Sequence, residues 1–133
     1  MLFVCVHNSG RSQMAEAFFN RLARGKYSAA SAGTEPSPGL NLTVVRVMAE
    51  AGIDLSNHKP KLLTPEMVKE ARRVITMGCG VAASCPALFT PTEDWGLTDT
   101  QCAPEAIVRQ IRDKIKGRIE KLIRELDRDL THS

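Results

Sequence analysis

A cysteine, an arginine and a serine stand close together near the start of the chain, in the stretch Cys5-Val6-His7-Asn8-Ser9-Gly10-Arg11-Ser12. A cysteine thiolate is a strong nucleophile, and an arginine side chain can donate two parallel hydrogen bonds to an oxyanion. We interpret Cys5 as a candidate nucleophile and Arg11 as part of an oxyanion site. Ser12 can donate its hydroxyl to the sulfur and cap a following helix.

The neighbouring sequence predicts the elements that position these residues. An apolar run at 1–4 indicates a strand, and the spacing over 13–19 indicates a helix. The start of a helix offers unpaired N–H groups and a partial positive charge, which attract an oxyanion and favour the thiolate of Cys5. Gly10 lets the loop turn tightly. The predicted oxyanion-binding residues are Val6, His7, Asn8, Ser9, Gly10 and Arg11.

A single cysteine beside a buried strand is usually a small core residue. The combination of cysteine, five-residue loop, arginine and serine between a strand and a helix favours the catalytic interpretation.

Composition bounds the class of protein. The chain has 133 residues, of which 43% are hydrophobic and 25% charged, and its net charge is +3. These values are typical of one soluble globular domain, which we place at 1–128, with a polar C-terminal tail at 129–133. No apolar run is long enough to span a bilayer, and the opening residues lack the features of a signal peptide. We therefore expect a cytoplasmic monomer that binds neither membrane nor nucleic acid.

Strands and helices are predicted to alternate along the chain. Helices are expected at 12–23, 41–51, 65–71 and 104–127, strands at 27–32 and 74–77, and a loop with a possible short helix near 81–84 at 78–91. This alternation predicts a parallel sheet covered on both faces, with ligands at the carboxyl ends of the strands. Cys5 and Cys79 both follow predicted strands, so both should emerge at that edge.

Several blocks of the chain resemble arsenate reductases of the thioredoxin-coupled class, which share the low-molecular-weight protein tyrosine phosphatase fold. The blocks are FVCVHNSGRSQMAE at 3–16, SAGT at 31–34, GIDLSNH at 52–58 and WGLTD at 95–99. Phosphatases of this fold usually have proline after the serine, whereas Gln13 is similar to the reductases. The resemblance implies a flavodoxin-like, three-layer α/β fold with a four-stranded parallel sheet flanked by helices.

The resemblance also implies a reaction that uses three cysteines. Cys5 attacks arsenate, for which phosphate or sulfate are mimics; a second cysteine then attacks Cys5, and a third carries the disulfide to thioredoxin. Cys79 and Cys85 fill these two roles, although their spacing is one residue shorter than the class pattern, and Cys102 is the alternative second thiol. Zinc binding by Cys79, Cys85 and His58 is the alternative without redox chemistry. We expect no metal and no organic cofactor.

The general acid and a possible ion site follow from the same resemblance. The WGLTD block places the acid on Asp99, with Asp94 as the alternative. Other members bind potassium through an Asn, a Glu, a Ser and an Asp. The first three of these ligands match Asn8, Glu16 and Ser31 by position. The fourth, the aspartate, falls at or near Lys61. An ammonium at Lys61 would pair with Glu16 in place of the ion, so no potassium dependence is expected. Asn8 should hold the loop by side-chain hydrogen bonds, and His7 should point outward or sideways.

Two other classes of function stay open. A low-molecular-weight phosphatase, acting on phosphotyrosine or small phosphate esters, needs only Cys5, Arg11 and Asp99 and leaves the other cysteines unexplained. A protein that binds an oxyanion without turnover needs neither an acid nor mobile thiols. The charged face of the last helix is interpreted as a solvated surface.

Overall fold

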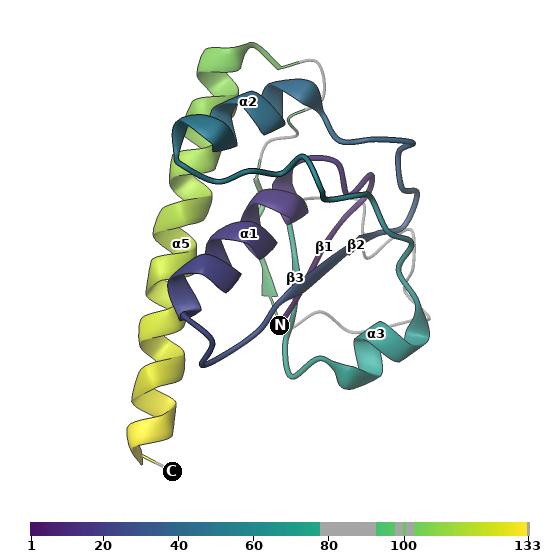
Figure 1. Cartoon of the computed structure of the whole chain (residues 1–133). Coiled ribbons are helices and arrows are strands. Elements are labelled where there is room, and N and C mark those ends of the chain that lie inside the picture. The colour runs from purple at the N-terminus through teal and green to yellow at the C-terminus, as the bar shows by residue number, and fades with distance from the viewer. Residues whose placement is uncertain (78–92, 98–99, 101–102, 133) are drawn as a thin grey trace.

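The protein is an α/β sandwich built on one parallel sheet (Figure 1). The computed structural model describes residues 1–77, 93–97, 100 and 103–132. Four strands pair in the order β2-β1-β3-β4, with bounds β1 Leu2–Cys5, β2 Ala30–Gly33, β3 Val74–Thr76 and β4 Glu93–Asp94. Every pair is parallel, which confirms the predicted four-stranded parallel sheet flanked by helices.

Two sets of helices cover the two faces of the sheet. Their bounds are α1 Arg11–Ala23, α2 Leu42–Glu50, α3 Pro65–Glu70 and α5 Glu105–His132. Alternate side chains of β1 point to opposite faces: Phe3 packs in a core with α1, α2 and α5, whereas Val4 packs in a second core with α3. The sheet is therefore buried on both sides, as an all-parallel sheet requires.

Local signals account for the helix ends. The Asn41 side chain accepts hydrogen bonds from the amides of Thr43 and Val44 at the start of α2, and the Thr64 hydroxyl accepts one from Met67 at the start of α3. The α1 helix begins one residue earlier than predicted, with Gly10 as its N-cap and no side-chain capping bond. The prediction that Ser12 caps this helix is therefore wrong.

The predicted second strand was placed too early. Residues 27–29 do not join the sheet, because the Asn20 side chain pairs with both backbone groups of Ala29, at 2.8 and 3.1 Å. The strand instead runs on to Gly33, which the sequence placed in a loop and which pairs with Cys5. The carboxyl end of β2 therefore lies directly beside the nucleophile.

The last helix is longer than predicted. Helix α5 continues to His132 instead of ending near Asp127, so it covers most of the segment interpreted as a C-terminal tail. Ile111 and Ile115 are buried on the side of α5 that faces the core, whereas Ile107 is 37% exposed and Val108 is buried in its place. None of the described helices is both long enough and apolar enough to cross a membrane.

Candidate active site

The loop between β1 and α1 is held from outside through its carbonyl groups. Backbone amides of the segment after β2 donate to them: Thr34 to Cys5 at 3.3 Å, Glu35 to Val6 at 2.8 Å, Ser37 to His7 at 3.0 Å and Asn41 to Ser9 at 3.0 Å. In a trans peptide the carbonyl and the next N–H point in opposite directions, and the described chain has no cis peptide. The N–H groups that follow these carbonyls are thereby turned away from this segment, toward the interior of the loop.

The nucleophile candidate lies at the end of β1, at the bottom of this loop. Cys5 is 3% exposed, and its sulfur accepts a hydrogen bond from the Asn8 amide at 3.1 Å. The Ser12 hydroxyl lies 2.9 Å from the same sulfur. Two groups therefore hold the sulfur in one position, and both can stabilise a negative charge on it.

Asn8 determines the direction of these bonds. Its Oδ1 accepts hydrogen bonds from the Lys61 amide at 2.8 Å and from Gln13 Nε2 at 3.0 Å, which assigns the other amide atom as nitrogen. That Nδ2 donates to Ser12 Oγ at 2.7 Å. Because Ser12 Oγ accepts from Asn8, its own hydrogen is free to be donated to the sulfur when Cys5 is a thiolate. The prediction that Asn8 holds the loop by side-chain hydrogen bonds is confirmed.

Asn8 also has an unusual backbone. Its φ is 51°, in the left-handed region that asparagine adopts more readily than most residues. The turn brings both the amide and the side chain of Asn8 to the nucleophile.

Arg11 is buried between the loop and the far side of the sheet. Its Nη1 donates to the carbonyls of Met77 at 3.2 Å and Leu97 at 2.9 Å, and the residue is 7% exposed. Two backbone carbonyls thus fix the orientation of the guanidinium at the carboxyl ends of β3 and β4. The two-pronged contact of Arg11 with an oxyanion stays a prediction.

A second polar network supports the loop from α1. Gln13 is fully buried, and its Nε2 donates to the carbonyls of Asn8 and Lys59, both at 3.1 Å. Its Oε1 lies 3.2 Å from His58 Nδ1, so that nitrogen carries the hydrogen. From the sequence, Gln13 is only a family marker and His58 only a candidate zinc ligand. The structural role of the pair was missed, because the spacing of a helix does not reveal which buried polar residue contacts a distant loop.

Glu16 completes this network one turn further along α1. The carboxylate is 7% exposed and lies 3.4 Å from His58 Nδ1 and 3.4 Å from the Lys61 ammonium. The predicted pairing of Lys61 with Glu16 is confirmed. We call this group of residues the supporting cluster; it consists of Asn8, Gln13, Glu16, His58 and Lys61.

The residues do not fit the potassium site that the family resemblance implied. Among the described residues, the buried hydroxyl of Ser31 has no hydrogen-bond partner, as expected of an ion ligand that holds no ion. However, the side-chain oxygen Oδ1 of Asn8 already accepts hydrogen bonds from two N–H groups. The Glu16 carboxylate already faces the Lys61 ammonium and His58. Among the residues described, no group of three or more His, Cys, Asp or Glu side chains could hold a metal ion.

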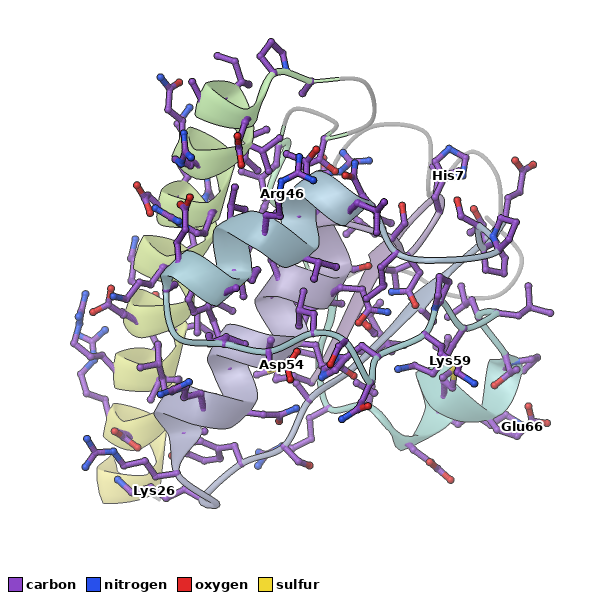
Figure 2. All side chains as sticks on the ribbon, turned by 45° about the horizontal axis from the view of Figure 1, so that its top comes forward. His7, Lys26, Arg46, Asp54, Lys59 and Glu66 are labelled. Atoms are coloured by element: carbon purple, nitrogen blue, oxygen red, sulfur yellow. The ribbon has the colours of Figure 1, made fainter. Side chains whose placement is uncertain are left out.

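Two further predicted residues, His7 and Asp94, are described by the structure, and the remaining ones are not. His7 is half-buried, with Nδ1 3.2 Å from the Glu35 carbonyl (Figure 2). The exposed Asp94 accepts a hydrogen bond from the Thr76 hydroxyl at 2.8 Å on the sheet. The residues Cys79, Cys85, Asp99 and Cys102, and the possible helix at 81–84, lie outside the described residues.

The fold and the loop define an α/β protein with a cysteine-based oxyanion site at the carboxyl edge of a parallel sheet. The family model for low molecular weight phosphotyrosine protein phosphatase matches residues 1–132. The chain therefore belongs to the low-molecular-weight phosphotyrosine protein phosphatase family.

Relatives within this family include both reductases and phosphatases. An arsenate reductase of Staphylococcus aureus (strain Newman) is 36% identical over 120 residues, which cover 89% of this chain and 91% of the relative. A thioredoxin-dependent arsenate reductase of Corynebacterium glutamicum superposes with a TM-score of 0.80 at 33% identity, over 96% of this chain and 61% of that one. An arginine phosphatase of Geobacillus stearothermophilus gives a TM-score of 0.84 at 26% identity, over 99% of this chain and 96% of that one.

Proposed function

We propose that this protein is an arsenate reductase that uses Cys5 as its nucleophile and thioredoxin as its reductant. The observation that carries the proposal is the buried Cys5 sulfur, which lies between the Asn8 amide and the Ser12 hydroxyl. The carbonyls of the surrounding loop accept hydrogen bonds from the segment after β2, on the outside of the loop. Arsenate is a tetrahedral oxyanion that such a loop can accept. The similarity to arsenate reductases over most of the chain supports reduction over hydrolysis.

The first step is attack of the Cys5 thiolate on arsenic. The loop amides and Arg11 bind the arsenate oxygens, the Ser12 hydroxyl and Asn8 amide orient the sulfur, and Asp99 protonates the departing oxygen as water. An As(V)–sulfur bond forms and an arsenic–oxygen bond breaks, with no electron transfer yet.

The second step supplies the electrons. The thiolate of Cys79 attacks the Cys5 sulfur, the sulfur–arsenic bond breaks with its electron pair on arsenic, and arsenite leaves. Two thiols have become one disulfide while As(V) has become As(III). Cys85 then attacks this disulfide and presents a Cys79–Cys85 disulfide to thioredoxin, whose two thiols restore the enzyme. Cys102 is the alternative to Cys79 as the second thiol.

The supporting cluster takes the place of a bound cation in this proposal. The Lys61 ammonium neutralises Glu16 beneath the loop, and the Lys61 amide and Gln13 hold the Asn8 side chain in the orientation that directs Ser12 to the sulfur. We therefore propose that catalysis needs no potassium. We further propose a monomeric, cytoplasmic enzyme.

A phosphatase is the second candidate, because an arginine phosphatase has the same fold and the chemistry needs only Cys5, Arg11 and an acid. The test measures arsenate-dependent NADPH oxidation with thioredoxin and its reductase, and separately the hydrolysis of p-nitrophenyl phosphate and of phosphoarginine. The proposal predicts rapid turnover of arsenate that Cys5→Ser abolishes. Hydrolysis of either phosphorylated substrate without arsenate turnover would assign the loop to a phosphatase. Arsenate binding without turnover of any substrate would indicate an oxyanion-binding protein.

A further inference from the structure

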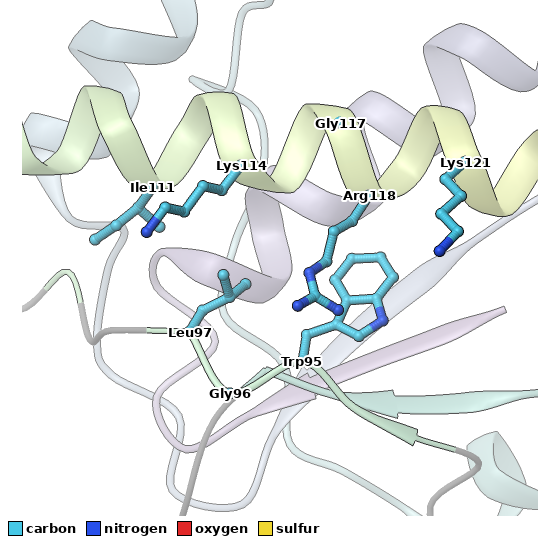
Figure 3. Close-up of a pocket in the computed structure, with 8 residues that line it drawn as sticks. All are labelled: Trp95, Gly96, Leu97, Ile111, Lys114, Gly117, Arg118 and Lys121. Carbon is cyan, nitrogen blue, oxygen red and sulfur yellow. The ribbon is translucent and has the colours of Figure 1, made fainter.

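A basic hollow lies between the segment that follows β4 and the middle of α5 (Figure 3). Its volume is about 580 Å³. The lining consists of an apolar wall and three cationic side chains: Trp95, Leu97 and Ile111, with Lys114, Arg118 and Lys121. The reaction proposed above does not use this surface.

The cations of the hollow have no acidic partners in the part of the chain that the structure describes. No carboxylate there lies within 4.0 Å of the side-chain nitrogens of Lys114, Arg118 or Lys121, and all three residues are exposed. By contrast, Arg109 on the first turns of the same helix is paired with Glu50 at 2.8 Å. The middle of α5 therefore presents a local positive charge without a direct ion pair among the described residues; Glu125, which pairs with Arg73 at 4.0 Å, lines a smaller adjoining hollow with Arg118 and Lys121.

The shape of the wall adds an apolar component. The Arg118 guanidinium lies over the Trp95 ring, 5.7 Å from its centroid, a cation–π distance that also limits the freedom of the arginine. Leu97 is half-buried beside them. Trp95 and Ile111 are 5% and 4% exposed, so a ligand in the hollow meets the cations together with an apolar surface that is mainly Leu97.

The spacing of the cations selects an extended ligand. Lys114 and Lys121 are seven positions apart, which is about 10.5 Å along a helix, with Arg118 between them. A small oxyanion needs donors that converge on one point, whereas these are spread along a line. An extended peptide covers this length with about three to four residues, at about 3.4 Å per residue.

The rest of the helix surface argues against nucleic acid as the ligand. Asp113 and Glu120 are exposed on α5 among its cations. A continuous phosphate backbone would pass close to such carboxylates, while a short acidic segment can be confined to the hollow. We propose that the basic hollow docks an acidic segment of a partner protein, with an apolar side chain of that segment against the wall.

The position of the hollow connects it to the loop. The Leu97 carbonyl accepts a hydrogen bond from Arg11 at 2.9 Å, so the wall of the hollow and the oxyanion loop share one contact. A segment docked in the hollow would contact Leu97, the residue whose carbonyl orients Arg11. This proposal does not depend on the reaction that the loop performs.

The experiment uses the fluorescence of Trp95, which is the only tryptophan of the chain. The probe is a capped pentapeptide with a central leucine flanked by two glutamates on each side, and the control peptide has glutamines in their place. We expect a saturable fluorescence change with the acidic peptide that weakens as salt is added, and none with the neutral peptide.

Two charge-matched variants locate the binding. The double variant Lys114→Gln, Lys121→Gln should bind the acidic peptide about fivefold more weakly, because each exposed ion pair contributes modestly. The variant Lys116→Gln, Arg124→Gln removes the same charge from exposed positions of α5 outside the hollow and should bind like the wild type. Arg118 is left intact because it stacks on the reporter.

Four results would overturn the proposal. They are no fluorescence change with the acidic peptide, equal binding of the neutral peptide, equal losses in both double variants, and tighter binding of a single-stranded oligonucleotide than of the peptide. Thermal unfolding of each variant confirms that it folds. Arsenate turnover, measured separately, shows whether the proposed reaction stands when this proposal fails.

Discussion

The Ser12 hydroxyl lies 2.9 Å from the Cys5 sulfur and accepts its own hydrogen bond from Asn8 at 2.7 Å. The three residues form a chain of hydrogen bonds in which Ser12 can donate to the thiolate of Cys5. Local sequence brings them together, because Cys5 ends a strand and Ser12 lies in the first turn of the next helix.

Removing the Ser12 hydroxyl should slow the reaction more than it destabilises the fold. A hydrogen bond to a charged group contributes about 1.5–3 kcal/mol, so Ser12→Ala should lower kcat/KM for arsenate by about ten- to a hundredfold. The rate of Cys5 alkylation by iodoacetamide should fall with it, since the thiolate loses a donor. An unchanged alkylation rate and kcat/KM would show that the hydroxyl does not act on the sulfur.

A methyl group at Gly10 should disturb the loop through one identifiable contact. A Cβ there would collide with the Thr100 hydroxyl, and overpacking of this kind costs about 1–3 kcal/mol. We expect Gly10→Ala to lower the unfolding free energy and the turnover rate, and Thr100→Ala to restore part of both in the double variant. No recovery in the double variant would contradict the contact.

Gly33→Ala is the matched comparison for this rescue. Its Cβ would lie 2.6 Å from the carbonyl oxygen of Val6, which is backbone and cannot be trimmed. Thr100→Ala should therefore give Gly33→Ala no benefit.

The supporting cluster should make the protein insensitive to potassium. The wild type is expected to have the same melting temperature and arsenate turnover in potassium chloride and sodium chloride. Lys61→Met leaves the buried Glu16 carboxylate without its ammonium and should lower the unfolding free energy by about 1–3 kcal/mol. Lys59→Met, at an exposed neighbouring position, is the control and should change little. If the melting temperature of the wild type rises in potassium chloride but not in sodium chloride, the protein binds potassium and this prediction is wrong.

Glu50 should make the contact between α2 and α5 depend on acidity. Hydrogen bonds from Arg109, with a further one from Arg112, lower the pKa of Glu50 from 4.5 to about 2. A lowered carboxyl pKa contributes stability above the unfolded pKa that is lost as pH falls through the folded one. The stability difference between the wild type and Glu50→Gln should therefore be full at pH 7 and shrink from about pH 4.5 to about pH 2.

The measurement is urea unfolding of both proteins across that range. Glu120→Gln, an exposed carboxyl substitution on α5, serves as the control. A difference that does not vary with pH would show that the ion pair contributes nothing.

The sequence predicts the part of the fold that has strong local signals. The apolar run before Cys5, the helix expected at 41–51 and the long helix expected from residue 104 all correspond to observed elements. The two-residue strand β4 was not predicted from its own residues, because Glu93 and Asp94 are polar and have no strand periodicity. The family resemblance supplied the fourth strand instead.

The site was predictable where its residues are close in sequence. Cys5, Arg11 and Ser12 could be recognised from spacing, and Lys61 opposite Glu16 from the family pattern. The contacts of Arg11 with Met77 and Leu97 join residues 66 and 86 positions apart, and no local pattern encodes such a pairing.

The central claim is that arsenate is reduced by the thiols of this chain. The most direct test mixes the reduced protein with one equivalent of arsenate, without thioredoxin, and measures arsenite and remaining free thiols. The account predicts arsenite formation with the loss of two thiols per arsenite in the wild type and in Cys102→Ser, and none in Cys5→Ser or Cys79→Ser. For Cys85→Ser it predicts the same single turnover, and no return of free thiols when thioredoxin and its reductase are added afterwards. Arsenite formed without loss of thiols, or no arsenite at all, would contradict it.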